Sequence, residues 1–173
     1  MSLFLLSSTM AFGGLLLLYG ILRADAPNWP PPGGRVLPLG LASAATAAIA
    51  GSSAALHLGY RALLRARAPL LLPWLLAAIC LGLLFVALEI ALWLQLWGAG
   101  FVLGNRHAGA FYTLTSFHFA HVAIALGLLA WLVPGALRQR YHARENVRVR
   151  LVGRFWHFLG INWLLLFAAF FLW

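Results

Sequence analysis

The 173-residue chain has few charged residues, and their types are unevenly represented. Only three residues are acidic, none is lysine, and all twelve basic residues are arginine. Charged residues make up 9% of the chain against 64% hydrophobic residues, which leaves too little polar surface for a sizeable soluble domain. The net charge of +9 could indicate a nucleic-acid partner. However, most arginines lie at the ends of apolar segments, where they would contact anionic lipid headgroups, so we expect no nucleic-acid partner.

Cysteine and buried acidic residues are almost absent as well. The single cysteine, Cys80, lies inside an apolar segment, so an intrachain disulfide and a cysteine-based metal site are excluded. We expect Cys80 to be a small core residue. Only one acidic residue, Glu89, lies in an apolar segment, whereas a di-iron or copper site would need more ligands of this kind. We therefore expect the chain to bind no metal.

Five long apolar segments occupy most of the chain, at residues 3–22, 36–58, 70–97, 110–133 and 155–173. Each is near the length of about 20 mainly apolar residues that crosses a hydrocarbon core of about 30 Å. Backbone groups in lipid must be hydrogen-bonded within a helix or a closed barrel, and these segments lack the alternating pattern of barrel strands. The sequence therefore predicts an all-α bundle of five transmembrane helices, forming a single membrane domain over residues 1–173.

The arginines predict the orientation of this bundle. Nine of the twelve follow the second or the fourth apolar segment: Arg61, Arg65, Arg67, Arg138, Arg140, Arg144, Arg148, Arg150 and Arg154. Cytoplasmic connections carry an excess of basic residues, so we expect the N-terminus to be cytoplasmic and the C-terminus periplasmic, in a bacterial inner membrane. The first segment has no charged leader and no convincing cleavage site, so it is expected to be a retained helix rather than a signal peptide.

Ionisable residues within the apolar segments are candidates for function because they are costly in lipid. They are Glu89, His118, His121, His57 and His157. Glu89 falls in the outer half of the third segment, and His118 and His121 share one face in the outer half of the fourth. We expect a hydrogen bond from Glu89 to one of these histidines, either as a structural link or in a proton or ligand role. His57 and His157 are expected near cytoplasmic helix ends, in contact with headgroups.

Haem binding is an alternative, because histidines in membrane bundles often hold b-type haem. Two histidines can flank one iron only when they come from facing helices at equal depth. His118 and His121 lie on one predicted helix and cannot flank one iron, whereas His57 and His157 could form such a pair. A self-contained haem b cytochrome is therefore one hypothesis for this chain.

Two of the predicted helices have a distinctive composition. Small residues dominate positions 40–55, and small faces let helices pack closely in lipid, so this helix is expected to be central in the bundle. The last helix is rich in aromatic residues, which are expected to face lipid or a partner and to form a belt at its outer end. These aromatic residues are Trp163, Phe167, Phe170, Phe171 and Trp173.

Several motifs resemble one family of membrane proteins. Residues 111–122 (FYTLTSFHFAHV) resemble the T-G-F-H-G-x-H-V signature of subunit III of haem–copper respiratory oxidases. Residues 155–164 (FWHFLGINWL) resemble the closing Y-W-H-F-V-D-x-V-W-L helix of that family. Residues 82–89 are similar to its G-x-x-F-x-x-x-Q helix, and residues 22–33 to its L-R … W-P-P-x-G loop. The matches run in order over essentially the whole chain and correspond to the short five-helix form of the family.

The resemblance implies a non-catalytic accessory subunit of a terminal haem–copper oxidase, of the cytochrome c or quinol type, in aerobic respiration. It implies that the partner is the catalytic subunit I, which holds haem and copper, and that this chain has no catalytic, cofactor-binding or metal-binding residues. The polar family positions are Glu89, His118, His121 and His157. Phospholipids are expected as further ligands, with headgroup contacts from Arg61, Arg138 and His57.

The chain also departs from the family pattern. Ser8 stands where the family usually has glutamate, Glu89 where it has glutamine, and Gly160 where it has aspartate. Ser116 and Phe119 replace the two glycines of the histidine motif. These replacements indicate a divergent branch, and an accessory subunit of a bacterial nitric oxide reductase is therefore an alternative within the family.

Overall fold

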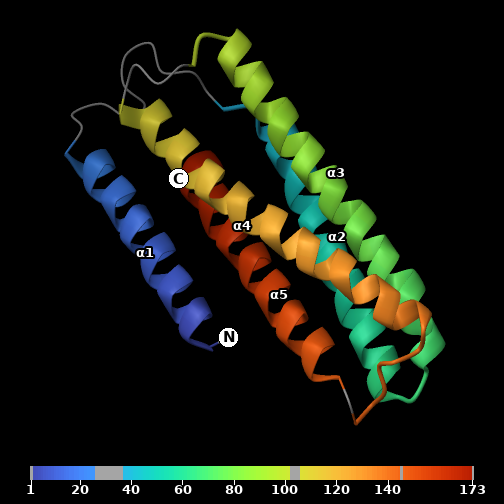
Figure 1. The fold of residues 1–173 in the computed structure, drawn as a ribbon. Helices are drawn as coiled ribbons and strands as arrows, with labels where there is room; N and C mark the ends of the chain where they lie inside the picture. Colours follow the sequence, from blue (N-terminus) through green and yellow to red (C-terminus); the bar gives the residue numbers. More distant parts are fainter. Residues whose placement is uncertain (1, 26–36, 102–105, 145, 173) are drawn as a thin grey trace.

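The computed structural model describes residues 2–25, 37–101, 106–144 and 146–172, with the side chains of the first helix from residue 6 onward. It contains five long helices: α1 (Ser2–Ala24), α2 (Leu39–Leu64), α3 (Leu71–Gly98), α4 (Arg106–Leu137) and α5 (Val147–Phe167). A short 3₁₀ turn, η1 (Ala68–Leu70), precedes α3, and a π-helical end, η2 (Ala168–Leu172), follows α5. No strand occurs in the described ranges, and all five helices are long and apolar enough to span a membrane (Figure 1). The predicted all-α class with five transmembrane helices is confirmed.

The arginine-rich segment before residue 155 is helical, which the sequence analysis did not predict. Helix α5 begins at Val147, and Val149 and Val152, three residues apart, are both buried in the bundle, while Arg148 and Arg150 stay exposed. His157 therefore lies in the interior of α5, and the expectation that it lies near a helix end was wrong. The proline-rich segment at residues 29–34 lies outside the described part of the chain.

Helices α4 and α5 form the centre of the bundle. Each packs substantially against three other long helices, with α1 along one side and the α2–α3 pair on the other (Figure 1). The expectation that α2 is central was wrong. Its small residues instead allow a close pairing with α3, in which the Ser52 hydroxyl donates a 2.6 Å hydrogen bond to the Ala78 carbonyl.

A glycine allows α3 to approach the two central helices. A Cβ atom added at Gly82 would lie 2.8 Å from Cη2 of Trp156 on α5 and 2.9 Å from Cδ2 of Leu126 on α4. Carbon atoms do not approach this closely without displacement, so a larger side chain at this position would require Trp156 and Leu126 to shift. Gly82 thus leaves room for these two side chains against α3.

The aromatic end of the chain packs inward more than the sequence indicated. Trp163 and Phe170 are buried, with the Phe170 ring 4.5 Å from the ring of Tyr19 between centroids. The expectation of a lipid-facing aromatic surface was therefore wrong for these two residues, whereas Phe167 and Phe171 are half-buried and stack on one another. Trp173 lies outside the described residues.

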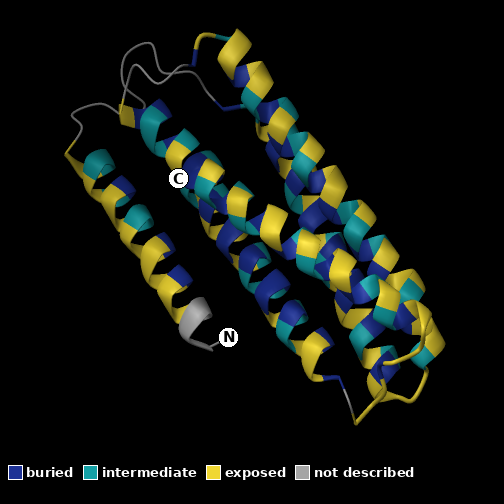
Figure 2. Cartoon of the chain, in the orientation of Figure 1, coloured by how far each residue is buried: buried dark blue, intermediate teal, exposed yellow. Residues whose placement is uncertain are grey.

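Cys80 is exposed on the outer side of α3, so the expectation of a core cysteine was wrong. Helix α3 is apolar on all sides, and its sequence therefore does not distinguish the side that faces lipid from the side that faces the bundle. Figure 2 shows the same division along every helix, with buried residues on the inner face and exposed apolar residues outside.

Candidate functional site: a buried polar cluster around His118

His118 lies where four helices meet. Its side chain comes from α4 and is fully buried. Its ring centroid lies 6.1 Å from that of Phe12 on α1, 5.8 Å from Phe85 on α3 and 5.5 Å from Trp163 on α5. The histidine is thus enclosed by aromatic rings from the three helices that pack against α4.

A hydrogen bond between helices fixes the orientation of this ring. The Nε2 atom of His118 lies 3.1 Å from the backbone carbonyl oxygen of Leu159 on α5, so Nε2–H is the donor. The other ring nitrogen, Nδ1, is buried and has no hydrogen-bond partner in the described part of the chain. Since one nitrogen is already committed to the backbone of α5, this arrangement is that of a structural link between α4 and α5.

His121 lies on the α1 side of the same helix, in a different environment. Its Nδ1 atom is 2.8 Å from the carbonyl oxygen of Phe117, one turn earlier in α4. Its ring lies 5.4 Å from the ring of Phe12 between centroids. This hydrogen bond is local to α4, so the two histidines of the family motif have different structural roles.

Glu89 is fully buried on α3, one turn from Phe85. Neither of its carboxyl oxygens has a hydrogen-bond partner among the residues that the structure describes. The predicted hydrogen bond from Glu89 to His118 or His121 was therefore wrong. The matching depth of these residues was a poor guide, because His118 Nε2 and His121 Nδ1 are hydrogen-bonded to backbone carbonyl oxygens instead.

His57 and His157 are brought together on α2 and α5, with their ring centroids 6.2 Å apart. The two helices touch on both sides of this pair. A Cβ atom added at Gly160 would lie 3.2 Å from the Ser53 hydroxyl oxygen, and one added at Gly153 would lie 4.0 Å from a Leu56 methyl group. A hollow of about 270 Å³ beside the pair, lined by His57, Tyr60, Arg154 and His157 among others, is smaller than a haem, so α2 and α5 would have to separate to hold one.

In the described part of the chain, the titratable side chains do not gather into a larger cluster. Over the described ranges, no group of three or more histidine, cysteine, aspartate or glutamate side chains is placed to hold a metal ion. That the chain binds neither haem nor metal remains a prediction.

The comparisons with known proteins agree with the motifs. The family model of cytochrome c oxidase subunit III matches residues 1–173. The chain belongs to this family. Cytochrome c oxidase subunit 3 of Thermostichus vulcanus is 30% identical over 95% of this chain and 81% of its own length. The subunit 3 of Synechocystis sp. is 29% identical over 98% of this chain and 72% of its own length. The probable subunit 3 of Nocardia farcinica is 30% identical, with coverages of 96% and 83%.

Two departures from the usual subunit III pattern can now be placed. Ser8 is buried on α1, and Gly160 of α5 faces Ser53, whose buried hydroxyl has no partner among the described residues. Small, uncharged groups therefore occupy the positions where the family usually has acids.

The residues expected to contact lipid headgroups are all exposed. Arg61 lies in the last turn of α2, Arg138 directly follows α4, and His57 lies two turns before the end of α2. The sequence analysis missed a hollow at this same end of the bundle, where α4 ends and α5 begins. The signal was the three-residue spacing of Val149 and Val152, a helical period that indicates the start of an amphipathic helix rather than a loop.

Proposed function

We propose that this chain is a non-catalytic accessory subunit of a haem–copper cytochrome c oxidase in a bacterial inner membrane. The observation that carries the proposal is the match of the subunit III family model over the whole chain. Several polar contacts support it, because they join helices to one another. For example, the Trp163 indole donates a 2.9 Å hydrogen bond to Thr46 of α2, and His118 donates to Leu159 of α5.

In this proposal the redox centres belong to the partner, the catalytic subunit I, and this subunit stabilises it. Exposed apolar side chains on the outside of the bundle support such an association. Met10 and Leu17 of α1 are 71% and 67% exposed, and Leu94 of α3 is 69% exposed. In a membrane these faces can contact lipid or the apolar helices of a larger subunit.

Phospholipid is the second proposed partner. Arg61, Arg138 and His57 are exposed near the arginine-rich end of the bundle, which we define as the ends of α2 and α4 and the starts of α3 and α5. Long basic side chains at this level reach lipid phosphates while their stems stay on apolar surface. We assign this end to the cytoplasmic side because it holds most of the arginines.

A nitric oxide reductase is a second candidate for the partner, favoured by the replacement of usual family residues at Ser8, Glu89 and Gly160. The oxygen and nitric oxide consumption of the purified complex separates the two candidates. An oxidase complex would consume oxygen with reduced cytochrome c or quinol as donor, whereas a reductase complex would consume nitric oxide.

Copurification tests the proposal. The chain is tagged after Trp173, extracted in a mild detergent and purified from its own host. We expect a larger membrane protein containing haem and copper to copurify in a fixed ratio. After a harsher detergent separates the two proteins, this chain should show no Soret absorption. One equivalent of haem retained by the separated chain would instead show a self-contained cytochrome, and no copurifying redox protein would rule out the accessory role.

A further inference from the structure

A hollow of about 460 Å³ lies between two connections at the arginine-rich end of the bundle. One connection joins α2 to α3 and the other joins α4 to α5, and both are at the same end of the bundle (Figure 1). The hollow is lined by four apolar and two basic residues: Leu63, Ala66, Ala68, His142, Ala143 and Arg144. The two connections therefore form one composite surface, which we call the tip and define as residues 63–68 and 138–144.

Two turns of the same kind shape the tip. Ala66 follows α2 with a φ of +58°, and Gln139 follows α4 with a φ of +48°, the left-handed conformation in which many helices end. After α2, the Arg67 N–H donates a 3.0 Å hydrogen bond to the Ala62 carbonyl, and the corresponding bond after α4 is 2.9 Å long. Each helix therefore ends sharply, and both connections stay folded against the same end of the bundle.

The position of the tip along the helices places it on the water side of the lipid headgroups. The apolar segments of α2 and α4 end near Leu58 and Val133, five residues before Leu63 and Arg138. At 1.5 Å per residue, these residues extend each helix about 7 Å past the hydrocarbon core. The headgroup layer is itself about 5–8 Å thick on each side of the core. The tip therefore faces water, where a soluble segment has access and acyl chains do not.

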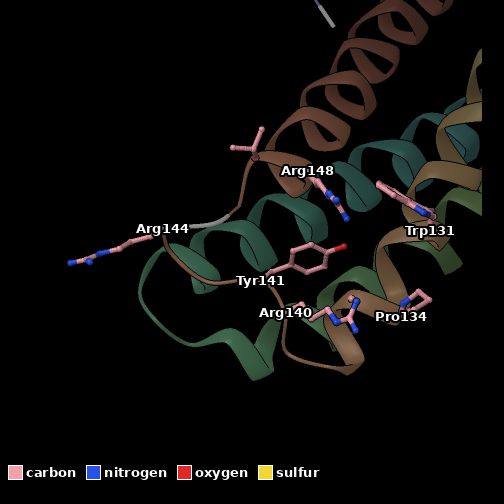
Figure 3. A pocket seen from close by; sticks show the side chains of 8 residues that line it. Trp131, Pro134, Arg140, Tyr141, Arg144 and Arg148 are labelled. Atoms are coloured by element: carbon pink, nitrogen blue, oxygen red, sulfur yellow. The ribbon is translucent and has the colours of Figure 1, made fainter.

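The tip carries a dense positive charge. Its arginines are all exposed: Arg65, Arg67, Arg138, Arg140 and Arg144. None of its residues is acidic, and Glu145, which follows it, lies outside the described part of the chain. Figure 3 shows the Arg144 side chain extended away from Tyr141 and Arg148 and out from the bundle. A concentration of like charges of this kind attracts groups of the opposite charge.

The apolar lining distinguishes a protein segment from a small anion. An inorganic anion would gain nothing from an apolar hollow, whereas a peptide can place an apolar side chain there and its carboxylates against the arginines around it. Leu64, next to the hollow, is also 48% exposed on the tip. Exposed apolar groups beside basic ones are typical of a contact surface between proteins.

We propose that the tip docks an acidic extramembrane segment of a neighbouring protein subunit. An apolar side chain of that segment occupies the hollow against Leu63 and Ala143, and its carboxylates pair with tip arginines such as Arg67 and Arg144. The proposal rests on the proposed function for the identity of this subunit, the haem–copper partner. It adds to that association a polar contact outside the lipid.

Photocrosslinking in native membranes identifies the occupant of the hollow. Ala143 lines the hollow and is exposed, so Ala143→Cys is made in a Cys80→Ser chain and labelled with benzophenone maleimide. The control is Ile161→Cys in the same background, because Ile161 is exposed in the middle of α5 and cannot reach a segment outside the membrane. After irradiation, mass spectrometry identifies each adduct. We expect the label at Ala143, and not the label at Ile161, to capture a peptide rich in aspartate and glutamate.

Charge reversal tests the role of the arginines. Arg67→Glu/Arg144→Glu should lower the yield of the acidic adduct about tenfold, and about 0.5 M sodium chloride should lower it in the wild-type background. The matched control is Arg150→Glu/Arg154→Glu, which makes the same change of charge at exposed residues of α5 that line the separate hollow beside His57. It should lower the yield less than about twofold.

Three results would overturn the proposal: phospholipid as the only adduct at Ala143, no adduct there, or equal losses in the two double variants. Thermal unfolding of each variant shows whether the bundle is intact, and copurification of the haem–copper partner is measured on the same membranes. A captured acidic segment from a protein without haem or copper would refute the proposed function alone. A copurifying haem–copper partner without an acidic adduct at Ala143 would refute the docking surface alone.

Discussion

The Nε2 atom of His118 and the carbonyl oxygen of Leu159 lie 3.1 Å apart, which joins the two central helices through one hydrogen bond. His118 belongs to the family motif and is surrounded by rings from α1, α3 and α5. This histidine therefore has a structural role in the bundle, because its ring packs against three helices and its Nε2 atom is hydrogen-bonded to the backbone of α5.

This contact predicts the effect of His118→Phe. Phenylalanine keeps a ring at the centre of the cluster but removes the donor to Leu159, and interhelical hydrogen bonds in membranes contribute about 0.6 kcal/mol on average. We expect a loss of about 0.5–1.5 kcal/mol in the free energy of unfolding, measured in mixed detergent micelles. His121→Phe is the matched control, and it should lose less because the hydrogen bond of His121 Nδ1 is to a carbonyl oxygen of its own helix. Equal losses would contradict the account.

Gly82 provides a test of helix spacing. Gly82→Ala would place a methyl group against Trp156 and Leu126, and overpacking of this kind costs about 1–3 kcal/mol. Gly127→Ala is the control, because a Cβ atom there meets nothing within 4 Å. We expect the first variant to unfold at a lower temperature and the second at an unchanged or higher one. A Gly82→Ala chain as stable as the wild type would refute the close packing.

Glu89 predicts an unusual mutational response. A buried polar group without a partner costs about 1–3 kcal/mol, so replacing it with an apolar residue of similar size removes that cost. We expect Glu89→Leu to leave the isolated chain equally stable or more stable, and Glu89→Gln to change it little. Chemical denaturation of the purified chain measures both. If Glu89→Leu were clearly less stable, the carboxyl group would have a stabilising partner beyond the described residues.

Reporter fusions test the orientation. The arginine-rich end is assigned to the cytoplasm, so alkaline phosphatase fused after Trp173 should be active and a fluorescent protein fused there should be dark. The same reporters fused after Arg67 should give the opposite result. A C-terminal reporter active only in the cytoplasm would reverse the assignment.

The number and class of the helices were predictable because a helix that spans lipid requires a long apolar segment. The sequence has five such segments, so five transmembrane helices were expected. Helix facing was harder to predict. Cys80 and Trp163 both lie in continuously apolar segments, yet Cys80 is exposed and Trp163 is buried. Periodicity carries little information there, because the outside of a membrane helix is as apolar as its inside.

The contacts between helices were predictable only in part. Proximity of His57 to His157 followed from their depth, but depth alone also suggested a bond from Glu89 to His118 that does not form. The direction of a side chain depends on helix rotation, which the sequence constrains weakly in lipid. The hollow where α4 ends and α5 begins was missed because the arginines before residue 155 were assigned to a cytoplasmic connection rather than to the start of α5.

The turnover of the oxidase complex purified from a strain lacking this chain tests the accessory role most directly. We expect its initial turnover per haem to stay close to that of the complete complex, because we propose that the redox centres belong to the partner. Its yield or its lifetime during turnover should fall, because the proposed stabilising subunit is missing. A complex with intact haem and copper but no initial turnover would contradict the account and show a direct catalytic role.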